Sequence, residues 1–202
     1  MRSATRRTLI ACAPALAIAA LAPVHPWLEH TMARHMGLEL PALFLLGCAL
    51  PLCGGTARSP CFAAWNAHGL PGLLAALCTT GFWMLPAALD QAVLHEGMAL
   101  AKVASLVGAG AWAAASWPRA GTVLQAFFVL NGFWMMLAAG LLYQEAPEQL
   151  CAVYLVDQQP AAGRALVCWA AAGLAAWLAH LAFVSRVFTQ GDDDASAAAV
   201  AP

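Results

Sequence analysis

The sequence predicts an all-α bundle of membrane-spanning helices, and its composition and its apolar runs support this prediction. Hydrophobic residues make up 62% of the 202 residues, charged residues only 9%, and the mean hydropathy is +0.73. A soluble domain carries about 25% charged residues, so this chain lacks the polar side chains to cover a water-soluble surface. The sequence also contains several apolar runs of about 20 residues each, which is the length that a helix needs to cross a hydrocarbon core. We therefore expect one polytopic membrane domain over residues 1–188, in contact with the lipid bilayer.

Six apolar runs are the expected transmembrane helices. They cover residues 8–24, 35–53, 67–89, 95–117, 122–143 and 161–184. The first run follows three arginines and ends in Ala-Leu-Ala-Pro, so it also fits a cleavable signal peptide, and both interpretations stay open. Residues 189–202 contain an acidic run and an alanine-rich end, and we expect them to form a disordered cytoplasmic tail.

The distribution of arginines predicts the orientation of the bundle. Cytoplasmic loops carry an excess of basic residues. With the N-terminus inside, the residues on the cytoplasmic side are Arg2, Arg6, Arg7, Arg58, Arg119 and Arg186, and only Arg34 and Arg164 lie near the outer ends. Both termini are therefore expected to be cytoplasmic, in the inner membrane of a bacterium.

Several classes of function have no support in the sequence. There is no basic stripe for nucleic acid, no phosphate-binding glycine loop and no nucleophile beside a base, so we expect a protein that is not an enzyme. None of the seven cysteines form a Cys-x-x-Cys pair. Cys151, in an outward loop, is open to three interpretations: a thiolate ligand, a disulfide partner of Cys168, or an inert buried residue.

Histidines and methionines gather on the predicted outer face. The start of the second helix carries His35 and Met36, preceded by His30 and Met32, and imidazole and thioether groups together suit copper. Simple interfacial residues without a metal remain the alternative.

Two charged residues fall inside predicted spans. Glu39 and Lys102 each lie near the outer end of a helix, where an unpaired charge costs about 2.5–3.5 kcal/mol. We predict that these two side chains approach each other, either as a structural ion pair or as part of an ion pathway.

Haem ligation is a further alternative. His68 and His180 fall near the cytoplasmic ends of their spans, and a b-type haem needs histidines from facing helices. His35 with His95 is the other pair. Gln125 and Asn131 in the fifth span are expected to make hydrogen bonds between helices.

Two stretches resemble a known family. Residues 31–36, Thr-Met-Ala-Arg-His-Met, running into Leu40-Pro41, resemble the His-Met-x-x-His helix entry of the CtaG-type polytopic membrane family of cytochrome c oxidase assembly factors. That family also has Leu-Tyr followed by Asp-Gln-Gln-x-Ala-Gly and a tryptophan. This second motif is similar to Leu142-Tyr143, Tyr154, residues 157–163 (Asp-Gln-Gln-Pro-Ala-Ala-Gly) and Trp169. In the first stretch Thr31 stands where the family has a histidine, and the second has one extra residue before its glycine. The chain would be a diverged, shortened member.

The resemblance implies a helper in oxidase biogenesis that handles copper at the outer face of the membrane. His35 and Met36 would be the first ligands, followed by His30, Met32, His95 and Asp157. Glu39 and Lys102 would adjust the site by contacting the ligands and not the metal. The implied partners are oxidase subunits or periplasmic copper chaperones. A haem-binding subunit and a metal-free accessory subunit of a respiratory complex are the alternatives.

Overall fold

The computed structural model describes residues 24–50 and 64–200, with side chains to position 185, and in these ranges the protein consists of helices joined by turns and loops, with no strand. The longer elements are α4 (Leu40–Ala49), α6 (Leu70–Phe82), α7 (Pro86–Leu94), α8 (Glu96–Ser116), α9 (Thr122–Glu145) and α10 (Gln159–Val200). The short elements are α2 (His25–Leu28), α3 (Met32–Arg34), the π-helical turn η1 (His35–Glu39) and the 3₁₀ turns η4 (Trp117–Arg119) and η5 (Val156–Gln158). The all-α prediction is confirmed for these ranges.

Within the described residues, three helices are long and apolar enough to cross a membrane. They are Glu96–Arg119, Thr122–Glu145 and Val156–Ser185, and α6 with α7 makes a fourth if that bent pair counts as one span. The predicted second span corresponds to η1 and α4, which do not pass this test, and its end lies outside the described residues. The predicted first span lies outside them except for Val24. Residues 24–50 and 64–200 thus support a membrane protein, and the number of six spans stays a prediction.

The predicted span over residues 67–89 is not a straight helix. The chain bends by 75° between α6 and α7. Pro86 is the first residue of α7, and Leu85 before it is extended, with φ −74° and ψ 129°. Proline disfavours the helical conformation of the residue that precedes it and lacks an amide hydrogen of its own, so the helix stops here. Hydropathy alone could not reveal the bend, because both arms are apolar.

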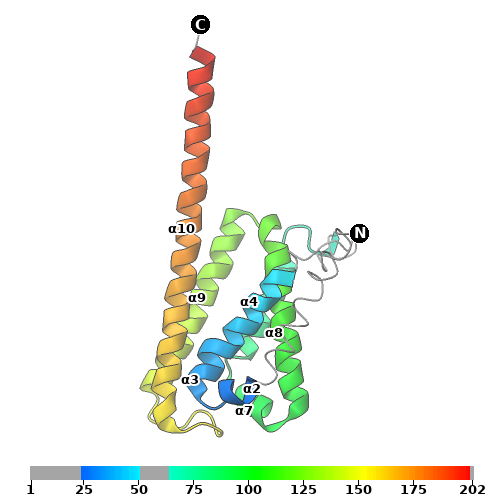
Figure 1. Cartoon of the computed structure of the whole chain (residues 1–202), viewed down its shortest axis with the longest axis vertical. Helices are drawn as coiled ribbons and strands as arrows, with labels where there is room; N and C mark the ends of the chain where they lie inside the picture. The colour runs from blue at the N-terminus through cyan, green and yellow to red at the C-terminus, as the bar shows by residue number, and fades with distance from the viewer. Residues whose placement is uncertain (1–23, 51–63, 201–202) are drawn as a thin grey trace.

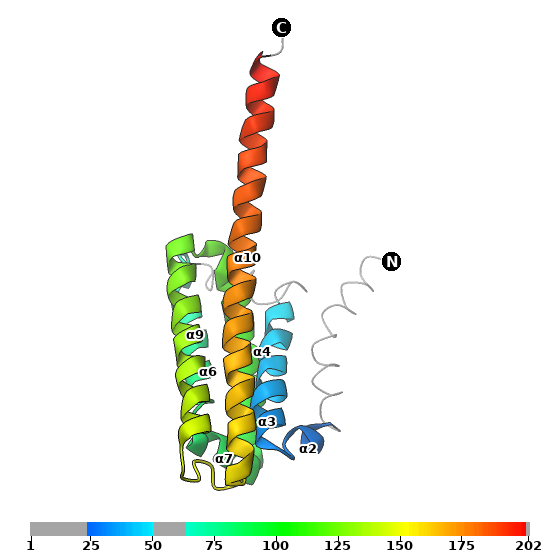
Figure 2. The same ribbon diagram turned by 90° about the vertical axis from the view of Figure 1, so that its left-hand side faces the viewer.

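The long helices pack through glycines. α4 lies against α8, and α9 lies side by side with α10 (Figures 1 and 2). A Cβ on Gly47 would collide with the carbonyl of Val107, and one on Gly110 would collide with the carbonyl of Phe44. Small residues let helix backbones approach closely, which is how transmembrane helices associate without a strong hydrophobic force.

The two ends of the bundle differ. The helices α2, α3 and α7 and the 146–155 loop gather at one end, whereas α10 projects far beyond the other (Figure 1). α10 remains helical to Val200, through the segment for which disorder is expected, and the many alanines there favour a helix. The main core, which includes Met32, Met36 and Leu166, lies toward the end with the short helices.

Candidate functional site

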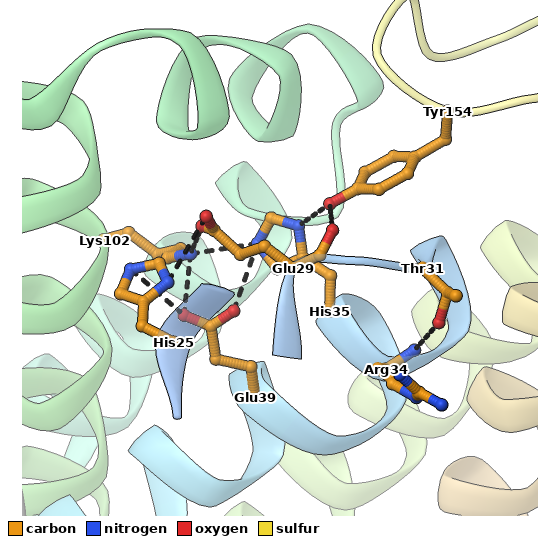
Figure 3. A network of polar contacts seen from close by, with 8 residues as sticks. All are labelled: His25, Glu29, Thr31, Arg34, His35, Glu39, Lys102 and Tyr154. Carbon is orange, nitrogen blue, oxygen red and sulfur yellow. Dashed lines mark hydrogen bonds and ion pairs between the residues drawn. The ribbon is translucent and has the colours of Figure 1, made fainter. Parts of the chain in front are cut away.

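A buried lysine is the centre of a polar cluster formed by α2, η1, α8 and the 146–155 loop (Figure 3). Lys102 Nζ lies 2.7 Å from Glu39 Oε1, 2.8 Å from Glu29 Oε1 and 3.0 Å from His35 Nε2. An ammonium group has three hydrogens to donate, so these three acceptors use all of them. Lys102 is completely buried, and Glu39 is 4% exposed. The predicted approach of Glu39 and Lys102 is therefore confirmed.

The hydrogen bonds of His35 fix its tautomer. Nε2 faces the Lys102 ammonium, which can only donate, so Nε2 accepts and Nδ1 carries the proton. Nδ1 lies 2.8 Å from the Tyr154 hydroxyl, which in turn donates to the Glu29 carbonyl at 3.0 Å. Burial raises the pKa of Tyr154, and the nearby carboxylates of Glu29 and Glu39 raise it further, so the phenol stays protonated. Both ring nitrogens of His35 are thus engaged within the protein.

His25, Glu29 and Glu39 form a group that could hold a metal ion. One ligand atom from each of the three lies within 4.8 Å of the others. His25 Nδ1 is 3.3 Å from Glu29 Oε2, and its Nε2 is 3.9 Å from Glu39 Oε1. Among the described residues, the buried Oε2 of Glu39 has no hydrogen-bond partner. That oxygen lies 3.6 Å from His35 Nε2, whereas the Glu39 oxygen nearest His25 is Oε1, which already accepts from Lys102.

The π-helical turn explains how residues so close in sequence share the buried side. In η1, His35, Met36, Gly37 and Glu39 are all buried. Pro41 follows, and it cannot donate to the carbonyl of Gly37 four residues before it. That carbonyl instead accepts a hydrogen bond of 2.7 Å from Trp169 Nε1 on α10. π turns of this kind occur often at functional sites.

Glutamines hold the loop that carries Tyr154. Gln158 Oε1 accepts a hydrogen bond from the backbone of Met32 at 3.1 Å, and Gln159 bonds to the backbone of residues 148 and 150. The carboxylate of Asp90 on α7 accepts from the backbone amides of Ala152 and Val153 at 2.7 and 3.2 Å. The two glutamines of the stretch that resembles the family's second motif therefore act in this structure as anchors of the loop.

The predicted metal ligands are not gathered into one group. His35 lies in the cluster, but Met32 and Met36 are packed in the apolar core, 0% and 1% exposed. His30, His95 and Asp157 are exposed. The structure brings together His25, Glu29 and Glu39 instead. The sequence feature that indicates this group is the spacing of four residues between His25 and Glu29, since it puts both side chains on one face of a short helix.

The predicted haem ligands have no suitable arrangement. His68 lies in the turn before α6 and His180 lies on α10, and both side chains are exposed. His95 is exposed as well, and neither nitrogen of its proposed partner His35 is free. The described residues therefore give no support to haem.

Removing the Tyr154 hydroxyl tests the link between loop and cluster. We expect Tyr154→Phe to lower the free energy of unfolding by about 1–2 kcal/mol, because His35 Nδ1 and the Glu29 carbonyl each lose a partner. Thermal unfolding in lipid nanodiscs measures this change. An unaltered melting temperature would show that these two bonds contribute nothing to the fold.

Cys151 is expected to be unreactive. It is free and completely buried, and burial, assisted by Asp90, raises the pKa of its thiol to about 11. Because the thiolate is the reactive form, alkylation at pH 8 should be at least about a hundredfold slower in the native protein than in the denatured one. Mass spectrometry of the alkylated peptide follows the reaction. Equal rates in both states would contradict the buried position.

Comparison with known proteins identifies no relative: no family model, no curated protein and no solved structure matches the chain.

Proposed function

We propose that this is a polytopic membrane protein that binds a divalent metal ion, with copper as the first ion to test, through His25, Glu29 and Glu39. The observation that carries the proposal is that His25, Glu29 and Glu39 each place one ligand atom within 4.8 Å of the other two. With both carboxylates ionised, the cluster carries one negative charge more than Lys102 neutralises, which favours a further cation. Lys102 would give up its contacts with the carboxylates when the ion enters.

The donor set limits the choice of metal. Imidazole and carboxylate groups suit divalent copper or zinc, whereas Cu(I) prefers thioethers and thiolates. Met32 and Met36 are packed in the core, so the proposal favours Cu(II) over Cu(I). The choice of copper over zinc rests on the resemblance to the CtaG-type family.

The role we propose is the handling of copper during assembly of a respiratory cytochrome c oxidase. In this proposal the chain crosses the inner membrane of a bacterium six times, both termini are cytoplasmic, and the cluster faces outward. The arginine distribution supports this orientation, and the position of the cluster at the start of α8 and beside the 146–155 loop is consistent with it. Oxidase subunits or periplasmic copper chaperones would be the partners.

A pair of matched variants tests the proposed role in the cells that express the protein. Glu29→Gln removes one ligand charge, and Glu145→Gln makes the same change at an exposed position at the end of α9. Under limiting copper we expect Glu29→Gln alone to lower oxidase activity, and added copper to restore it. Oxidase activity equal in the two variants, or a defect that copper does not relieve, would contradict copper handling.

The second candidate is a metal-free accessory subunit of a respiratory complex. The direct contacts of Lys102 with both carboxylates favour it, since they stabilise the cluster without any ion. In that case added copper should not change the oxidase activity of the Glu29→Gln variant.

A further inference from the structure

An exposed apolar face runs along α9. The most exposed of its side chains is Val123, at 86%, followed by Trp134 at 63% and Phe127 at 55%, with Leu130 and Leu141 also exposed. Phe127, Trp134 and Leu141 are seven residues apart, and Asn131 lies four residues after Phe127 and three before Trp134. This spacing is the heptad pattern by which two helices pack side by side with a crossing angle of about 20°.

A polar residue interrupts this face in the middle of the span. Asn131 is the tenth residue of α9, and its side chain is exposed between Phe127 and Trp134. The sequence predicts that it bonds to another helix, but within the described part of the chain its hydrogen bond goes to the Phe127 carbonyl of its own helix, at 2.8 Å. One amide hydrogen and the amide oxygen are left for a partner. In hydrocarbon no water can supply one.

We propose that two copies of the chain associate in the membrane through this face of α9, with the Asn131 side chains paired across the interface. Two copies inserted in the same orientation are related by a twofold axis along the membrane normal, so their α9 helices run parallel. Residues at the same depth then face each other. A side-chain amide both donates and accepts, so one asparagine is a complete partner for another.

A partner helix has to match both the heptad face and the Asn131 amide. The apolar seam needs a helix of similar spacing, and Asn131 needs a polar group at mid-membrane depth. A second α9 meets both requirements without any further component. Asparagine at such an interface commonly fixes the register of the two helices.

The number of copies in a lipid bilayer tests the proposal. The full chain carries one fluorophore at its C-terminus, and photobleaching steps are counted over a range of protein-to-lipid ratios. We expect dimers of the wild-type protein. Asn131→Ala should raise the dissociation constant about 3- to 20-fold, the range measured for hydrogen bonds between membrane helices.

Three further variants make the test specific. Trp134→Ala should also weaken the dimer, Asn131→Gln should preserve it, and Leu178→Ala, a similarly exposed apolar position on α10, should leave it unchanged. Single photobleaching steps for the wild-type protein at every ratio would overturn the proposal. So would a dimer that Asn131→Ala and Trp134→Ala leave as stable as the wild type.

Discussion

Replacing Lys102 by methionine should lower the free energy of unfolding by about 3–5 kcal/mol. The ammonium is completely buried and bonds to Glu39, Glu29 and His35, and methionine keeps much of the volume but none of the charge. Removing one member of a buried ion pair costs this much because the remaining carboxylate is left without a partner. Chemical unfolding in nanodiscs measures the loss.

A double variant separates charge from packing in this result. Lys102→Met combined with Glu39→Gln removes both members of the closest ion pair, so no buried charge remains at that contact. We expect the double variant to be more stable than Lys102→Met alone, which gives a favourable coupling energy between the two positions. If the effects of the two substitutions simply add, the ion pair does not stabilise the cluster.

Gly110→Val should separate α4 from α8 and is expected to cost about 3 kcal/mol. A Cβ at this position collides with the Phe44 carbonyl, which is backbone and cannot rotate away. Overpacking a tight contact costs about 1–3 kcal/mol, and the upper value applies where the neighbour cannot move.

Gly108→Val is the matched control for that prediction. Gly108 lies two residues away on the same helix, and a Cβ there meets no atom within 4 Å. We expect its melting temperature to stay near the wild-type value while that of Gly110→Val falls. Equal melting temperatures for the two variants would contradict the close packing of α4 on α8.

The sequence predicts the fold class and the helix positions better than it predicts the helix shapes. α8 and α9 begin within one residue of the predicted spans because long apolar runs with polar ends define them. The break between α6 and α7 follows from Pro86, which is the first residue of α7 and is preceded by the extended Leu85. Proline within a membrane helix can kink it or end it, and composition does not distinguish the two.

The site was partly predictable, for physical reasons. The pairing of Glu39 with Lys102 follows from the cost of an unpaired charge in hydrocarbon. The ligand group was not found, because it depends on α2 folding back so that His25 and Glu29 reach Glu39, a contact between separate helices. The sequence predicts Met36 as a ligand, but in η1 its side chain is buried in the core beside residues of other helices.

Binding of Cu(II) to the purified protein tests the central claim most directly. We expect one equivalent to bind to the wild type, none to bind to Glu39→Gln, and tighter binding to Lys102→Met, because that variant lacks the lysine that occupies the carboxylates. Zinc in place of copper reports whether the site selects between the two metals. The account predicts that order of affinities, and the absence of stoichiometric binding in all three proteins would contradict it.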